Sequence, residues 1–260
     1  MLLVSGFWIV CALYPLQAAL GELSESEIGR SKDAEDIFSA DGNPPDRASG
    51  GGRGTCVEQL IAIVPGSPLA DCNAVDAGLE SYSKSYLAQT VSQSPTIWIF
   101  VPEEFRSAPS AELVLLDEDE NLLWRSSPEP FQISQDRGII HLQIAYPLES
   151  ERTYRWLFTI TLDPDDFNRN PTVGGLIEHT PATGDLLELI ESIQARPDQI
   201  DAIYTQHGIW HDALTLSGEQ LSLDPNNEAF RNAWSTLLAS VGLSELADVP
   251  IANCCSNAPL

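Results

Sequence analysis

Residues 138–162 contain two neighbouring runs of alternating side chains, the feature that most restricts the possible fold. In the second run, the side chains on one face are apolar or aromatic. They are Tyr154, Trp156, Phe158, Ile160 and Leu162, and the opposite face holds Arg155, Leu157, Thr159 and Thr161. A period of two with aromatic and β-branched residues is typical of half-buried antiparallel strands. The sequence therefore predicts two such strands here.

The short polar corner between these runs, residues 146–154, has a recognisable form. A Leu, then a polar stretch, then a Tyr at the start of a strand resembles the tyrosine corner of Greek-key sandwiches. In that motif the tyrosine hydroxyl bonds to the backbone a few residues upstream. We predict this structural role for Tyr154. The alternative is that Tyr154 is one more aromatic residue of the core, whose hydroxyl still needs a partner.

About seven short strand-like segments precede residue 180, the number expected of an immunoglobulin-like or fibronectin-like sandwich. Besides the two runs above, they are residues 57–64, 96–101, 111–116, 122–125 and 173–179. The pair Gly174-Gly175 predicts a bulge in the last of them. Residues 71–90 are interpreted as a polar loop. Residues 55–180 are therefore predicted to form an antiparallel β-sandwich domain.

From Asp185 onwards, the apolar residues follow a helical period. Residues 181–260 are predicted to be a helical hairpin region packed on the sandwich, so the fold class is mainly β with a helical C-terminal part (α+β). Part of this region is similar to a tetratricopeptide repeat, in which small residues let two helices pack closely. The matching positions are Tyr204, Gly208, Trp210, Ala213, Leu214, Leu221 and Pro225. One degenerate repeat cannot form a solenoid.

The charge of the chain argues against two classes of partner. The 260 residues include 13 basic and 38 acidic side chains, a formal net charge of −25. Nucleic acids and anionic membrane surfaces both require basic patches, so we predict neither as a partner. A protein or another component of the cell envelope remains as the expected partner.

The N-terminal segment is typical of an export signal. Residues 1–21 are apolar and end in Ala19-Leu20-Gly21, a small-x-small cleavage site, although no Lys or Arg precedes the apolar run. An uncleaved anchor is the alternative. With cleavage, no stable membrane insertion is expected and the protein is periplasmic or secreted. Residues 22–54, poor in apolar side chains and ending in a glycine-rich run, are predicted to be a disordered linker.

Four cysteines follow the signal segment: Cys56, Cys72, Cys254 and Cys255. An even number in an exported chain predicts disulfides, with three possible connectivities. Adjacent cysteines rarely bond to each other, which favours pairing of Cys254 and Cys255 with Cys56 and Cys72. A short loop closed by Cys56 and Cys72 is the alternative.

His207 and His211 are four residues apart, a spacing that can hold a metal on one face of a helix. Asp212 completes the candidate ligand set, with Glu178 and His179 as further possibilities. The glutamate that zinc proteases place after the first histidine is absent, since Gly208 stands there. The alternative is that both histidines pack near Trp210. No nucleophile motif is present, so no catalytic residue and no cofactor are predicted.

Three tryptophans on predicted strands, Trp98, Trp124 and Trp156, offer a second alternative function, because exposed aromatic side chains can bind sugars. Alternation places at least Trp156 with Phe158 and Ile160 in the core instead. The leading hypothesis from these residues is a non-catalytic interaction or binding module of the cell envelope. A metal-dependent hydrolase centred on His207 and His211 and a carbohydrate-binding module are the alternatives.

The chain, from about residue 51 onwards, resembles a family of exported cyanobacterial proteins defined as domain of unknown function 928. The resemblance rests on a set of short motifs. They are Gly-Gly-Arg-Gly-Thr-Cys at 51–56, Trp-Ile-Phe-Val-Pro at 98–102, Ala-Glu-Leu-Val-Leu at 111–115, Tyr-Arg-Trp at 154–156, Ile-Glu at 177–178, Tyr204, His-Gly-Ile-Trp at 207–210, Asp-Ala-Leu at 212–214, Ser-Val-Gly-Leu at 240–243 and Cys-Cys at 254–255. The resemblance implies a bacterial envelope or secreted protein, and it implies no activity or catalytic residue.

Overall fold

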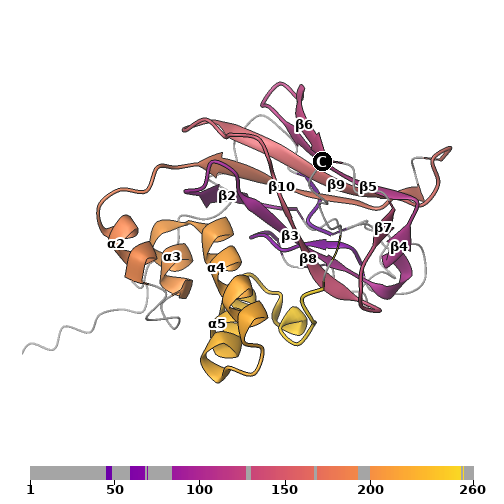
Figure 1. Ribbon diagram of the computed structural model, residues 1–260. Coiled ribbons are helices and arrows are strands. Elements are labelled where there is room, and N and C mark those ends of the chain that lie inside the picture. Colours follow the sequence, from indigo (N-terminus) through magenta and orange to yellow (C-terminus); the bar gives the residue numbers. More distant parts are fainter. Residues whose placement is uncertain are drawn as a thin grey trace, which may run out of the picture. The chain divides into compact units, whose positions relative to one another are not determined.

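The computed structural model describes residues 45–48, 59–67, 69, 84–126, 130–166, 169–192, 200–252 and 254. All of them belong to the larger of the two compact units into which the chain divides, Phe38–Leu260. This described part consists mainly of β-sheets with helices in its C-terminal part (Figure 1). The predicted α+β class is therefore confirmed.

The strands form two larger sheets and one small one. The five-stranded sheet has the order β2 (Leu87–Thr90), β10 (Thr172–His179), β9 (Thr153–Thr161), β5 (Ser110–Leu116) and β6 (Leu122–Ser126). The three-stranded sheet has the order β1 (Ile61–Ala62), β3 (Thr96–Val101) and β8 (Gly138–Gln143). The third pairs β4 (Ser107–Ala108) with β7 (Phe131–Gln132). All pairs are antiparallel except β10 with β2, which is parallel.

Burial in the strands follows the sequence pattern. In β9 the even-numbered residues from Tyr154 to Ile160 are buried, and the residues between them are half-exposed. In β3 nearly every residue is buried, as expected of a strand that is covered on both faces. Residues 210–223, a helix, cover one face of β3. The indole of Trp98 donates a hydrogen bond to Thr215 Oγ1 of this helix at 3.1 Å.

Several strand predictions are wrong in detail. β2 lies within the predicted polar loop 71–90, and β4 and β7 were not predicted. The pair Gly174-Gly175 makes no bulge, because β10 stays in register with β9 along its length. Gly175 is needed for close packing: a Cβ there would lie 2.7 Å from Trp156 Nε1. These strands are short and polar, or carry glycines, so their side-chain pattern is weak.

The corner before β9 carries the hydrogen bond that defines a tyrosine corner. The Tyr154 side chain is 1% exposed, and its hydroxyl accepts a hydrogen bond from the Glu149 backbone N–H at 3.0 Å. Here the chain crosses from β8, in the three-stranded sheet, to β9, in the five-stranded sheet. Tyr154 therefore fixes the path of this crossover.

Tyr154→Phe is expected to lower the free energy of unfolding by about 1–2 kcal/mol, because it leaves a backbone N–H in the corner without its partner. Urea denaturation measures the loss. Tyr146→Phe is the control, since it removes a hydroxyl from a partly exposed tyrosine in the same crossover. Equal stability of the two variants would contradict a structural role for the Tyr154 hydroxyl.

The helices of the described residues are α2 (Asp185–Ser192), α3 (Ile200–His207), α4 (Trp210–Leu223) and α5 (Glu228–Ser240), and their short 3-10 turns are η2 (Glu103–Phe105) and η6 (Ser244–Leu246). In Figure 1 the helices lie beside β2 and β3, and α4 packs against both strands. The Trp210 indole donates to the Ile63 carbonyl at 2.9 Å. The helical hairpin predicted from the repeat-like segment, Tyr204 to Pro225, corresponds to the end of α3 and the whole of α4.

The similarity to a tetratricopeptide repeat does not extend to the helix boundaries. Gly208 would lie inside the first helix of such a repeat, but here it separates α3 from α4. Its φ of +74° is the reason, because this left-handed conformation ends a helix and favours glycine. Within the described residues, no helix has both the length and the apolar character needed to cross a membrane.

Four residues of the predicted disordered linker, 45–48, are packed into the fold instead. Gly174 N–H donates to the Asp46 carbonyl at 2.9 Å. The buried guanidinium of Arg47 donates to the Val241 carbonyl, at the end of α5, at 2.7 Å. A single buried arginine cannot be recognised in a polar stretch of sequence, so the linker prediction is wrong here.

The C-terminal tail lies along the outer edge of β8. Ile139 N–H donates to the Pro250 carbonyl at 2.9 Å, and Ala252 N–H donates to the Ile139 carbonyl at 2.8 Å. Gly138 allows this approach, since a Cβ there would lie 2.5 Å from that of Ala252. The tail thus completes the three-stranded sheet.

Candidate binding surface

The outer face of the five-stranded sheet is the side that points away from the core. From three strands it carries alternate positions: Glu112, Val114 and Leu116 of β5, Arg155, Leu157 and Thr159 of β9, and Thr172, Leu176 and Glu178 of β10. From β6 it carries Leu122 and Arg125, which share this face because the β5–β6 register shifts between them. Cross-strand pairing sets Val114 opposite Leu157 and Leu116 opposite Leu122. These four side chains form an apolar strip across the face.

The basic side chains of this face are matched by acidic ones. Arg125 Nε lies 2.9 Å from Glu112 Oε1, and Arg155 Nη1 lies 3.3 Å from Glu120 Oε1. At the β10 edge, Lys84 Nζ lies 2.7 Å from Asp46 Oδ1. The whole chain has 38 acidic against 13 basic side chains. The outer face is therefore close to neutral on a strongly anionic protein.

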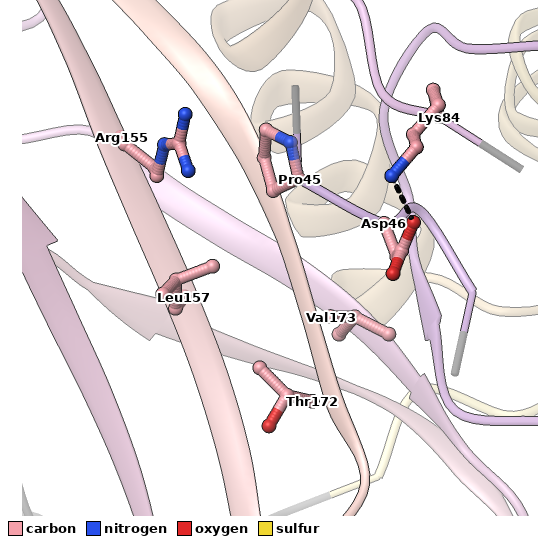
Figure 2. Close-up of a pocket in the computed structure, with 7 residues that line it drawn as sticks. All are labelled: Pro45, Asp46, Lys84, Arg155, Leu157, Thr172 and Val173. Carbon is pink, nitrogen blue, oxygen red and sulfur yellow. Dashed lines mark hydrogen bonds and ion pairs between the residues drawn. The ribbon is translucent and has the colours of Figure 1, made fainter. Parts of the chain in front are cut away.

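A shallow pocket of about 190 Å³ opens on this face (Figure 2). Its lining residues come from β9, β10 and the segments before β1 and β2. They are Pro45, Asp46, Lys84, Arg155, Leu157, Thr172 and Val173. Figure 2 shows Arg155 and the Lys84–Asp46 ion pair on opposite sides of the Pro45 ring. The pocket therefore combines apolar side chains with two cations and one carboxylate.

Gly174 explains why the pocket has this form. A Cβ at Gly174 would meet the backbone of Trp156, the side chain of Leu157 and the ring of Pro45. Its absence lets the segment around Pro45 lie directly against β10, where Asp46 accepts the Gly174 N–H. The wall of the pocket is thus built by residues that the sequence assigned to a linker.

The predicted metal ligands do not share a helix face. His207 is the last residue of α3, and His211 lies in the first turn of α4, beyond the break at Gly208. The assumption of one continuous helix through both histidines is wrong. Asp212 faces β2 instead, where its Oδ2 accepts from Thr90 Oγ1 at 2.8 Å and from Val91 N–H at 3.0 Å.

Of the two α4 residues in the predicted metal set, His211 is buried and Asp212 is half-buried. Burial lowers the pKa of His211 to about 3, and the Thr96 backbone offsets this only in part. Neither ring nitrogen of His211 has a hydrogen-bond partner of good geometry within the described chain. Burial raises the pKa of Asp212, and the hydrogen bonds from Thr90 and Val91 oppose that shift. His211 is thus a neutral core residue, and Asp212 links α4 to β2.

A second polar contact lies nearby, at the end of β10. The Ser150 hydroxyl and His179 Nδ1 are 3.1 Å apart. Glu178, the other residue considered as a ligand, accepts from Gln89 Nε2 at 3.1 Å. In the part of the chain that is described, no three His, Cys, Asp or Glu side chains converge as a metal site requires.

The tryptophans considered for sugar binding are placed differently from one another. Trp98 and Trp156 are 1% and 0% exposed, so both belong to the core. Trp124 is half-buried, opposite the inward-facing Leu115. No exposed strip of these three rings exists.

Of the four candidate cysteines, Cys254 is in the described part. It pairs with Ile133 in an isolated β-bridge and packs against the core. Cys56, Cys72 and Cys255 lie outside the described residues, as do the signal segment 1–21 and most of the linker 22–54.

Sequence reasoning missed the pocket because its parts are far apart in the chain. Alternation did place Arg155 and Leu157 on one side of a strand. Pro45 and Lys84 carry no comparable signal, since they come from segments interpreted as a linker and a loop.

A comparison with protein families matches residues 48–251 to Domain of Unknown Function (DUF928). The match covers most of the chain, so the protein belongs to this family. No curated protein matches the sequence significantly.

Proposed function

We propose that this protein is a non-catalytic, exported module of the cell envelope that binds a protein partner through the outer face of the five-stranded sheet. The observation that carries the proposal is the near-neutral apolar strip on that face, with a pocket beside it. Apolar strips rimmed by polar residues are typical of protein–protein interaction sites.

An immunoglobulin-like sandwich is part of the proposal, and the strand order supports it. In that fold, strands A, B and E share one sheet, and C′, C, F and G share the other. β1, β3 and β8 are adjacent in the order A–B–E, and β6, β5, β9 and β10 in the order C′–C–F–G. The tail beside β8 takes the place of strand D, and Tyr154 opens the strand equivalent to F.

Export is supported by the sequence of residues 1–21, with its small-x-small site at 19–21. An oxidising compartment is further supported by Cys254, which is in the disulfide-bonded state. We propose that this bond clamps the tail, and that its partner is Cys56 or Cys72.

Site-specific photo-crosslinking in intact source cells tests the function. A benzophenone amino acid replaces Leu157, at the pocket, and the cells are irradiated before fractionation. We expect a discrete covalent adduct in the extracytoplasmic fraction. The chain that forms it should have the mass of a protein that starts near Glu22.

The matched control carries the same amino acid at Leu223, which is 86% exposed on α4 and away from the outer face. An adduct that forms equally from both positions, or from neither, would contradict the proposed binding face. A chain found only in the cytoplasm would contradict the proposed location.

A further inference from the structure

We infer that the partner on the outer face is a second copy of this chain, held in a two-fold symmetric dimer. In this dimer, Leu122 of each copy enters the pocket beside Leu157 of the other. The inference rests on the proposed function, because it names the occupant of the same face.

The first argument is a projection and a hollow at different places on one face. Leu122, on the edge strand β6, is 51% exposed although it is a large apolar residue. The pocket lies across the sheet, where Leu157 and Pro45 are apolar lining residues. Across the sheet, β6 lies about 10 Å from β9, since β5 lies between them, and the pocket extends from β9 to β10. A two-fold axis midway between Leu122 and the pocket, within the interface, places each Leu122 over the pocket of the other copy.

The second argument is the arrangement of charge. An isologous interface sets a surface against itself, so charges of a single sign would repel. The outer face instead alternates Arg125 with Glu112 and Arg155 with Glu120. Each guanidinium can therefore meet a carboxylate of the other copy. The helical region lacks this balance: residues 181–260 contain 11 acidic and 2 basic side chains.

The third argument concerns the salt dependence of dimerisation, which distinguishes a dimer from a complex with a basic partner. Two chains of net charge −25 repel each other over the rest of their surfaces. Salt screens this repulsion, with a Debye length of about 8 Å at physiological ionic strength. Dimerisation is therefore expected to strengthen as salt is added, whereas a basic partner protein would bind more weakly in salt.

Sedimentation velocity of the full chain tests the inference. We expect the dimer fraction, at about 1–200 μM protein, to rise as NaCl increases from about 20 to about 300 mM. A protein that remains monomeric over this whole range overturns the inference.

Variants of Leu122 test the contact itself. Leu122→Arg is expected to raise the dimer dissociation constant at least tenfold, because Arg155 and Lys84 border the pocket that it would enter. Leu122→Glu is expected to have a smaller effect for the same reason. Leu223→Arg adds an equal charge away from the face and is expected to change the constant less than about twofold. Leu122→Ser, which adds no charge, is also expected to raise the dissociation constant, because the apolar side chain is missing.

The crosslinking experiment separates this inference from the proposed function. An adduct from Leu157 with twice the mass of the chain supports both. An adduct with a different protein, together with a monomer in sedimentation, overturns the dimer and leaves the binding face intact. Absence of any adduct, together with a monomer, overturns both.

Discussion

Trp98→Ala is expected to lower the free energy of unfolding by about 3–5 kcal/mol, the cost of removing a fully buried tryptophan. The Trp98 side chain is 1% exposed and joins β3 to the helical region. Its indole donates to Thr215 on α4, and its ring centroid lies 5.7 Å from that of Trp234 on α5. Gly218 lies so close to the ring that a Cβ there would overlap it. The surrounding backbone therefore has little freedom to fill the cavity.

Chemical denaturation followed by circular dichroism measures the loss. Because Trp98 joins the sheets to the helices, we expect one cooperative transition at lower denaturant, with β and helical signals lost together. Trp124→Ala is the control, as it shortens a half-buried tryptophan at the sheet edge, and its cost is expected to be below about 2 kcal/mol. A Trp98→Ala protein no less stable than the control would mean that the helices do not depend on this contact.

Wild-type protein is expected to lose stability as the pH falls from about 6.5 towards 3, and His211→Leu should remove part of this loss. Burial lowers the pKa of His211 from its ordinary value of 6.5 to about 3 in the folded state. Between these values the unfolded chain binds a proton at this residue and the folded chain does not. Unfolding is thus favoured by acid, with a slope of up to about 1.4 kcal/mol per pH unit. Above pH 6.5 the imidazole of His211 is neutral in both the folded and the unfolded state, so it no longer lowers the stability.

The measurement is the free energy of unfolding of both proteins at pH 7, 6, 5 and 4. The many carboxylates of the chain titrate in both proteins, so the difference between the curves isolates His211. Since its ring nitrogens lack good hydrogen-bond partners, Leu should leave no polar group unsatisfied. His207→Leu, at the half-exposed end of α3, is the control. Parallel curves for wild type and His211→Leu would show that His211 is not buried as a neutral side chain.

The parts of the fold that the sequence predicted correctly are those where one face of a strand is buried. Trp156 and Phe158 lie on the apolar side of β9, and alternation is enough to place them in the core. The helical period after Asp185 likewise predicted helices there, and in α5 the residues Trp234 and Leu237 lie on the buried side. In these segments the local pattern and the tertiary contacts agree.

The parts that could not be predicted depend on contacts between distant segments. β2 is a short edge strand beside β10, and although its burial alternates, its sequence Leu-Ala-Gln-Thr does not alternate apolar with polar residues. The histidine pair failed for another reason, because the spacing of His207 and His211 assumes a continuous helix that Gly208 interrupts. The pocket needs residues separated by more than a hundred positions, from Pro45 to Thr172. No local period can reveal such an assembly.

The position of the tail beside β8 also sets an order of folding during synthesis. Ile139 exchanges hydrogen bonds with Pro250 and Ala252, more than a hundred residues later in the chain. During synthesis, residues 250–252 leave the ribosome more than a hundred residues after Ile139, so the outer edge of β8 stays open until they arrive. The sheet is therefore completed on this side only after residue 252 has been synthesised.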